Sequence, residues 1–195
     1  IPFASQGKTG NVTVNLGSKG IIELELIASG EKWGRGPKGD VHSSLKAMVD
    51  SPAWRLVQAL QTLVTEDGNT PAIEGWVENV RPLTDREKTL IREAAQAGDE
   101  AAQKQALGIT HWIDNLSYPD ALTRLAQEPT VNIEGLVAGY TGPGGKTILP
   151  GRAVAKLDLR LVPNQTRAEA EKKLRAHLDK HGFTDVEVNV SGGYD

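Results

Sequence analysis

Three side chains in this sequence, His42, Thr147 and Arg160, are of types that could bind an anionic group. His42 lies in a loop, residues 39–44 (GDVHSS), and loops on a rigid scaffold readily present side chains to a neighbouring molecule. Arg160 projects from the polar side of a predicted strand, where its forked donors suit a carboxylate. The sequence shows no nucleophile paired with a base and no credible set of metal ligands. We therefore predict that these groups serve a chemical centre that lies elsewhere.

Two of these side chains also have ordinary structural interpretations. An isolated histidine such as His42 is often only a solvated loop residue. An arginine on the open face of a strand is often solvated, or paired with a neighbour such as Asp158 for Arg160. Both interpretations stay open at the level of sequence.

The segment 144–147 (GGKT) resembles the end of a phosphate-binding loop. That motif also requires glycine at position 140, where this chain has Tyr140, and a helix after the threonine. Pro150 argues against such a helix. The segment therefore predicts a glycine-rich hairpin between two strands, with Thr147 near the mouth of the sheet.

The other histidines are interpreted as structural. His177 and His181 are four residues apart, the spacing of two metal ligands on one face of a helix. A metalloprotease helix also needs glutamate directly after the first histidine, where this chain has Leu178. Their place near the C-terminus of a predicted helix, where cations are favoured, explains them without a metal. His111, beside Trp112, has no recognisable partner in the sequence.

Length and composition are typical of a soluble globular protein. The 195 residues suffice for one domain, with 38% apolar and 24% charged residues. A net charge of −3 and a pI near 5.9 argue against nucleic-acid binding. The absence of cysteine excludes disulfides and thiolate metal sites, and no apolar run approaches the length of a membrane span. The compartment, cytoplasmic or exported, stays open.

Four runs alternate apolar and polar residues with a period of two, which predicts a sheet with one buried face and one open face. They cover residues 21–27, 131–137, 153–161 and 186–190. In the second run Val131, Ile133 and Val137 are expected on the buried face, opposite Asn132 and Glu134.

Two helices are predicted from caps and a period of 3.6. The first opens with Ser51 as N-cap and Pro52 as first helical residue, and the second with the capping-box sequence 166–169 (TRAE). The predicted apolar stripe of the first helix is Trp54, Val57, Leu60 and Val64. The predicted buried side of the second is Ala170, Leu174 and Leu178, with Gly182 after its last turn.

The resulting order, β-α-β-β-α-β, predicts an α+β fold. We expect a ferredoxin-like sandwich, in which two helices cover one face of a four-stranded antiparallel sheet. Its core would span about residues 19–64 and 130–192. A helical insertion, about residues 65–129, would pack on the sandwich, with a capping box at 84–87 (TDRE) and a short helix near 121–126. All of 1–195 is thus interpreted as one domain.

Several segments resemble, in the same order, the lid or dimerisation domain of the M20 family of metallopeptidases and deacylases. The nearest branch is that of the carnosinase-type dipeptidases. The segments are 19–26 (KGIIELEL), 39–44 (GDVHSS), 52–57 (PAWRLV), 129–135 (PTVNIEG), 142–150 (GPGGKTILP) and 160–163 (RLVP). Linked motifs in register are far more specific than any one of them, and together they cover nearly the whole chain.

The resemblance implies a larger parent enzyme, in which this lid interrupts a catalytic domain built around two divalent metal ions, usually zinc. The metal ligands would lie in that catalytic domain, and this chain contains no adjacent glutamates. The chain is therefore expected to be an excised or processed lid that holds no metal and hydrolyses nothing alone. The substrate of the parent would be a peptide or an N-acyl amino acid.

The resemblance also implies roles for the three side chains. The histidine that matches His42 reaches across a two-fold dimer and stabilises the oxyanion at the partner's scissile carbonyl. The residues that match Arg160 and Thr147 bind the carboxylate end of the substrate from within the same lid. The usual family glycine after the His-Ser pair is Ser44 here, which could alter the turn of the loop.

The predicted partners are a second copy of the chain, the catalytic domain and the substrate, without nucleic acid or membrane. Unpaired edge strands favour a two-fold homodimer. An RNA-binding module has the same element order, but the central strand offers Lys156, Asp158 and Arg160 instead of stacking aromatic residues. A non-catalytic small-molecule-binding or assembly domain remains the alternative.

Overall fold

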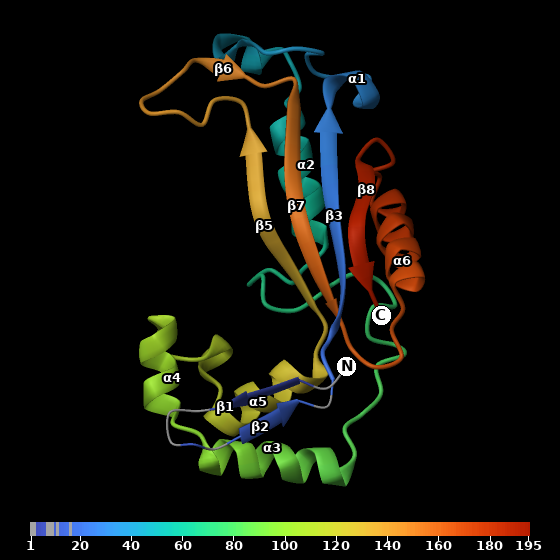
Figure 1. Cartoon of the computed structure of the whole chain (residues 1–195). Helices are drawn as coiled ribbons and strands as arrows, with labels where there is room; N and C mark the ends of the chain where they lie inside the picture. Colours follow the sequence, from blue (N-terminus) through green and yellow to red (C-terminus); the bar gives the residue numbers. More distant parts are fainter. Residues whose placement is uncertain (1–2, 7–9, 11, 16) are drawn as a thin grey trace.

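The computed structural model describes residues 3–6, 10, 12–15 and 17–195. At its centre lies a four-stranded antiparallel sheet in the order β5-β7-β3-β8 (Figure 1). The strands are β3 (Gly20–Ser29), β5 (Thr130–Ala138), β7 (Arg152–Leu161) and β8 (Glu187–Tyr194). Helices α2 (Pro52–Thr62) and α6 (Arg167–Lys180) pack on one face. The predicted ferredoxin-like α+β fold is confirmed.

The core lies between this face of the sheet and the two helices. The central strands β3 and β7 contribute alternate residues, as their period of two predicts. Its largest fully buried side chains include Ile22, Leu24, Leu26, Leu157, Leu159, Leu161, Leu56, Leu174 and Leu178. Because burial of each such side chain is worth about 1.5–3 kcal/mol, this cluster supplies most of the energy that fixes the sheet.

Helix α2 buries only part of the predicted stripe, because Leu60 is buried as predicted but its neighbours in the stripe are not. Trp54 and Val57 are 61% and 40% exposed, whereas Leu56 and Ala59 are fully buried. The helix also ends at Thr62, before the last residue of the predicted stripe. The prediction was wrong for Trp54 and Val57, because α2 packs against β3 and β7 with the side that bears Leu56, Ala59 and Leu60.

Strand β5 also departs from its prediction. Ile133 and Val137, expected on the buried face, are 50% and 54% exposed. The strand lies at the edge of the sheet, and the helices cover its neighbours instead. The register with β7 shifts between Ile133 and Gly135, and such a bulge changes the direction of the side chains that follow it.

Short elements flank the sheet at both ends (Figure 1). Beyond the end of β3 lie α1 (Gly30–Trp33), β4 (Val41–His42), the 3-10 helix η1 (Ser43–Ala47) and β6 (Ile148–Leu149). At the opposite end lie α3 (Asp85–Ala97), α4 (Glu100–Leu107), η2 (Ile113–Asn115) and α5 (Tyr118–Gln127) of the insertion. The capping box of Thr84 and Glu87 forms as predicted, while α4 was not anticipated.

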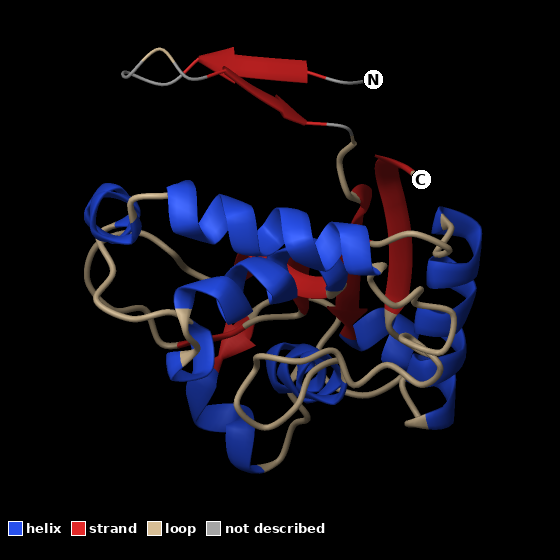
Figure 2. Ribbon diagram, turned by 90° about the horizontal axis from the view of Figure 1, so that it is seen from below, coloured by secondary structure: helices blue, strands red, loops and turns tan. Residues whose placement is uncertain are grey.

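A hairpin precedes the sheet. It consists of β1 (Phe3–Gln6) and β2 (Val12–Asn15) and was not predicted. Figure 2 shows it apart from the helices of the insertion. No helix in the described part of the chain is long and apolar enough to cross a bilayer.

His177 joins α6 to the end of α2. Its side chain is buried, and its Nε2 lies 2.9 Å from the carbonyl oxygen of Thr62, which can only accept. The backbone N–H of Glu74 donates to Nδ1 at 3.3 Å. Both contacts require the neutral ring with its proton on Nε2. Burial, followed by the nearby His181, lowers the pKa of His177 below its usual value.

We predict that this histidine makes the fold acid-sensitive. Because its folded pKa is lowered, its contribution to stability is present above about pH 6.5 and is lost as the pH falls through that value towards the folded pKa. Urea unfolding at pH values from about 7.5 to 5.5 would measure this loss. His177→Gln should flatten the slope, whereas His181→Gln, at an exposed site, should keep most of it. An unchanged slope in His177→Gln would contradict the assignment.

Candidate functional site

The structure brings His42 and Thr147 together. Strands β4 and β6 pair so that His42 lies opposite Ile148, and the Ser43 N–H donates to the Thr147 carbonyl at 3.2 Å. Both side chains are exposed, at the end of the sheet far from the chain termini (Figure 1). Sequence reasoning placed Thr147 at the mouth of the sheet but did not identify this ladder, which has only two residue pairs.

The ring of His42 is oriented by its own loop. The Ser44 N–H donates to Nδ1 at 3.2 Å, and the Ser44 hydroxyl lies 2.8 Å from the same nitrogen. A backbone N–H can only donate, so Nδ1 accepts and the neutral ring carries its proton on Nε2. The side chain of Ser44 thus contributes to the orientation of His42. The structure gives the Nε2–H no partner among the residues that it describes, so this group can donate to a molecule outside the loop.

Two close approaches fix this loop to the start of β7. The Gly151 N–H donates to Oδ1 of Asp40 at 3.0 Å, and the Gly151 carbonyl accepts from the Gly30 N–H at 3.0 Å. A Cβ at position 151 would lie 2.9 Å from the Gly39 backbone, closer than real Cβ atoms approach. Glycine is therefore required here for the position of His42.

Arg160 lies near the other end of β7, where it pairs with Thr130 of β5 and Ile21 of β3. Its Nε donates to Oδ1 of Asp158 at 3.2 Å, and its side chain is 43% exposed. Within the described part of the chain no partner is recorded for its two terminal nitrogens. Pairing with Asp158 and binding of an external carboxylate are therefore compatible, because they use different sides of the guanidinium.

Asp158 is the residue that orients this arginine. It is only 7% exposed although it lies on the open face of the sheet. Its Oδ2 accepts from the Asn132 amide at 2.9 Å, while Oδ1 accepts from Arg160. A carboxylate held from both sides in this way is a fixed support for the guanidinium.

Arg160 and Thr147 lie far apart within one chain. Gly151 holds the His42 loop at the start of β7, and Arg160 comes eight residues after Arg152 along that strand. At about 3.3 Å per residue the separation is roughly 26 Å. The expectation that Thr147 and Arg160 of one lid bind one carboxylate does not agree with this geometry, because Thr147 precedes β7 and Arg160 lies near the far end of the same strand.

The described residues include one group that could hold a metal ion, Glu74, His177 and His181, whose ligand atoms lie within 4.8 Å of one another. Both ring nitrogens of His177 are already engaged, as described above, and Glu74 accepts from Lys180 at 2.6 Å. This group therefore does not fit the two-metal centre implied by the resemblance. We derive no metal chemistry from it.

A further segment of the sequence has the spacing of two metal ligands. Residues 177–179 (HLD) have the His-x-Asp spacing of a metal-binding pair. In α6, however, Asp179 pairs with Arg175 at 2.7 Å, and His177 joins two backbone groups. The structural interpretation of His177 is thus favoured over a metal ligand.

The remaining motifs have structural explanations. Strand β6 follows Thr147, so the 144–147 segment belongs to a hairpin and not to a phosphate-binding loop. Within this hairpin the Tyr140 hydroxyl donates to the Pro143 carbonyl at 2.9 Å. His111 is exposed and lies 2.9 Å from the Thr110 hydroxyl.

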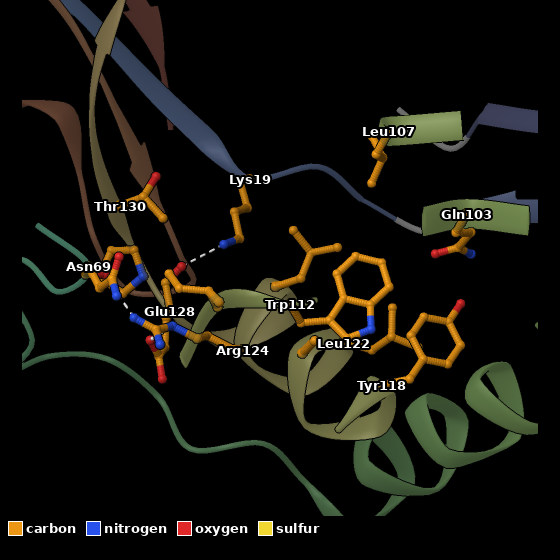
Figure 3. Close-up of a pocket in the computed structure, with 14 residues that line it drawn as sticks. Lys19, Asn69, Gln103, Leu107, Trp112, Tyr118, Leu122, Arg124, Glu128 and Thr130 are labelled. Carbon is orange, nitrogen blue, oxygen red and sulfur yellow. Dashed lines mark hydrogen bonds and ion pairs between the residues drawn. The ribbon is translucent and has the colours of Figure 1, made fainter. Parts of the chain in front are cut away.

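Two concave surfaces were not predicted. A groove of about 300 Å³ lies between α2 and β6, beside the His42 loop, and includes Ser43, Trp54 and Ile148. A second, more apolar pocket of about 420 Å³ lies in the insertion (Figure 3). The apolar residues around Trp112 and Leu122 were the only signal for this pocket, and by themselves they predict no more than a helical insertion.

Comparison with known proteins gives a consistent result. Residues 16–186 match the family model described as the peptidase dimerisation domain of M20 enzymes. The chain is 30% identical over 157 residues to Beta-Ala-His dipeptidase of Rattus norvegicus, covering 77% of this chain and 31% of that protein. It is 29% identical over 149 residues to Cys-Gly metallodipeptidase dug1 of Schizosaccharomyces pombe, covering 74% and 30%.

Solved structures agree with these matches. An M20 family metallo-carboxypeptidase of Sulfolobus solfataricus superposes with a TM-score of 0.82 at 36% identity, over 93% of this chain and 45% of that one. Human carnosine dipeptidase 1 shares the fold, with a TM-score of 0.75 at 23% identity, over 90% and 36%. The chain thus spans about a third of the length of its curated relatives. Fold, motifs and comparisons together show that it belongs to the peptidase dimerisation domain family of the M20 peptidases.

Proposed function

We propose that this chain is the lid and dimerisation domain of an M20-type di-metal peptidase or N-acyl-amino-acid hydrolase. In this proposal His42 and Thr147 act in the active site of the partner subunit, and Arg160 acts in the active site of its own subunit. The observation that supports it is the separation of roughly 26 Å between the two ends of β7. A dipeptide spans only about 7 Å, so His42 and Arg160 of the same lid cannot both contact one substrate molecule.

His42 would stabilise the oxyanion at the scissile carbonyl. The contacts of Nδ1 with Ser44 orient the exposed ring and leave Nε2–H as the donor, which is the preorganisation that such a group needs. Arg160 would bind the substrate carboxylate through its terminal nitrogens, with Asp158 as its support. The divalent metal ions of the catalytic domain, zinc in this proposal, would supply a Lewis acid and an activated water.

A two-fold homodimer would form through the edge of β5 and the outer side of α2. Ile133, Leu136 and Val137 of β5 are about half exposed, and Trp54 of α2 is exposed more than that. An unpaired apolar edge favours pairing with a second copy, and a buried tryptophan is a common anchor of such interfaces. The groove between α2 and β6 adjoins His42, so a partner docked there lies close to this histidine.

This proposal also accounts for the alternatives raised by the sequence. Family membership removes the reason to prefer an RNA-binding module. A non-catalytic assembly domain would explain the exposed edge of β5. It would not explain why Ser44 orients the ring of His42, or why Asp158 holds the guanidinium of Arg160.

We expect His42→Ala in the full-length enzyme to lower kcat/KM about 100- to 1000-fold, the usual effect of losing one oxyanion donor. Metal content should not change, because His42 is not expected to be a ligand. Ser44→Gly should cause a smaller loss, since it removes the hydroxyl contact but keeps the backbone N–H. Steady-state kinetics with metal analysis measure both. Full activity in His42→Ala would refute the role.

Arg160→Ala should weaken only substrates with a free carboxylate, mainly by raising KM. Asp158→Asn should raise KM for the same substrates by a smaller factor, because the Arg160 guanidinium loses its bond to a charged carboxylate. Lys156→Ala, on the open face of the same strand, is the matched control. Kinetics with a peptide and its C-terminal amide distinguish these variants. Equal losses on both substrates would count against carboxylate binding.

The isolated chain should form a dimer in sedimentation equilibrium. Trp54→Asp and Leu136→Asp should each shift it towards monomer, because they place a charge in the proposed interface. Val77→Asp changes an equally exposed apolar side chain outside β5 and α2 and should leave the dimer intact. A wild-type chain that stays monomeric at high concentration would contradict the interface.

A further inference from the structure

The apolar pocket of the insertion lies beside Arg160. Thr130 is one of its lining residues, and the same Thr130 pairs in register with Arg160 on the neighbouring strand. Residues directly opposite each other in a sheet project from the same face. The pocket therefore opens on the open face of the sheet, next to the guanidinium that we assign to carboxylate binding. Figure 3 shows Lys19 and Thr130 on the side of the pocket nearest the sheet.

The shape of the pocket suits a single apolar group. Its volume of about 420 Å³ lies within the usual range of small-molecule sites. Its apolar walls come from three segments, namely α4, the following loop and α5. A single helix face could not enclose a pocket of this kind. They include Leu107, Trp112, Tyr118, Leu122 and Leu125.

The aromatic wall is held in place before any ligand binds. Trp112 stacks on Tyr118 with ring centroids 5.6 Å apart. The Trp112 indole N–H donates to the Glu100 carboxylate at 2.9 Å, and Glu100 also pairs with Lys104 at 2.8 Å. A wall fixed in this way loses little conformational entropy when it packs against a ligand.

Among the residues that the structure describes, the Lys19 ammonium at this pocket forms no salt bridge with an acid. The Lys19 ammonium is half-buried and donates to the Glu128 carbonyl at 2.5 Å, at the C-terminal end of α5. The Glu128 carboxylate pairs with Arg124 at 2.8 Å, and Arg124 also binds Asp114. Lys19 comes two residues before Ile21, which pairs in register with Arg160, so the two cations belong to the same end and face of the sheet. Burial lowers the pKa of Lys19, Glu128 raises it, and the charge of Arg160 lowers it.

A purely structural role for Lys19 accounts for only part of this arrangement. Its bond to the Glu128 carbonyl ties α5 to the sheet, where a cation is favoured by the helix dipole. That bond uses one of three ammonium donors. The remaining donors, next to Arg160, would be satisfied by an anion between the two cations.

We propose that this pocket selects the substrate's C-terminal residue: its carboxylate lies between Arg160 and Lys19, and its side chain enters the pocket. The substrate class is then a peptide that ends in a large aromatic or branched aliphatic residue. This inference rests on the proposed carboxylate role of Arg160. It adds Lys19 and the insertion as determinants of specificity.

Binding to the isolated chain tests the proposal directly. N-acetyl-phenylalanine should bind in the low millimolar range and shift the indole resonance of Trp112 in a nitrogen-labelled sample. N-acetyl-phenylalaninamide and N-acetyl-glycine should each bind at least about tenfold more weakly, because one lacks the charge and the other the side chain. Lys19→Met should weaken the acid about tenfold and leave the amide unchanged. Thr123→Ala, on α5 but outside the pocket, is the control.

Two results would overturn the proposal: equal binding of the acid and the amide, or binding of the acid without a shift of Trp112. Absence of any binding would overturn it as well. In the full-length enzyme, Leu122→Ser should lower kcat/KM for peptides ending in phenylalanine by about 10- to 200-fold but leave peptides ending in glycine unchanged. Equal losses on both would also reject the pocket. Failure of the His42 or dimer predictions would leave these outcomes unaffected, so the two proposals fail separately.

Discussion

The constraint on which this structure depends is the unbroken antiparallel pairing of β3 with β7. The two strands pair from Gly20 with Leu161 to Ser29 with Arg152, without a shift in register. Their buried leucines and isoleucines fix the sheet to α2 and α6. Because the ladder is rigid, it holds the His42 loop at one end and Arg160 at the other. The same hydrophobic packing that stabilises the domain therefore separates its two candidate functional groups.

This separation gives the exposed surfaces a common explanation. A domain that acted alone would gain nothing from an apolar edge on β5 or an exposed Trp54 on α2, and both add a risk of aggregation. Around a two-fold axis these surfaces become an interface near His42. At the other end, Arg160, Lys19 and the pocket of the insertion form a second, separate region for recognition of the substrate.

The sequence was sufficient for the element order and for the central strands, because each strongly periodic segment has one dominant pattern. It failed where two patterns competed. On α2 both Trp54 and Leu56 belong to apolar stripes, and only contact with the sheet decides between them. On β5 the alternation of Ile133 and Val137 was real, but the edge position and the bulge override it. The β4–β6 ladder and α4 were too short or too polar to leave a clear signal.

The candidate side chains were found from motifs, yet their arrangement was not. Spacing in sequence cannot show that Thr147 lies beside His42, because their segments are joined only by the short β4–β6 ladder. The predicted strand 153–161 already separated Thr147 from Arg160, but the resemblance assigned both residues to one carboxylate. Nor could it show the support of Arg160 by Asp158, or the orientation of His42 by Ser44, since these depend on side-chain geometry. The role of the insertion was missed for the same reason, because its pocket combines three separate segments.

The most direct test of the account mixes two impaired variants of the full-length enzyme, assayed at a substrate concentration well below the KM of Arg160→Ala. Subunits with His42→Ala and subunits with Arg160→Ala are unfolded together and allowed to form dimers again, and hydrolysis of a carboxylate-bearing peptide is measured. If His42 acts across the dimer and Arg160 acts within its own subunit, each mixed dimer has one intact site, and activity returns to about one quarter of the wild-type value. If both residues serve the same subunit, no activity returns, and the account is contradicted.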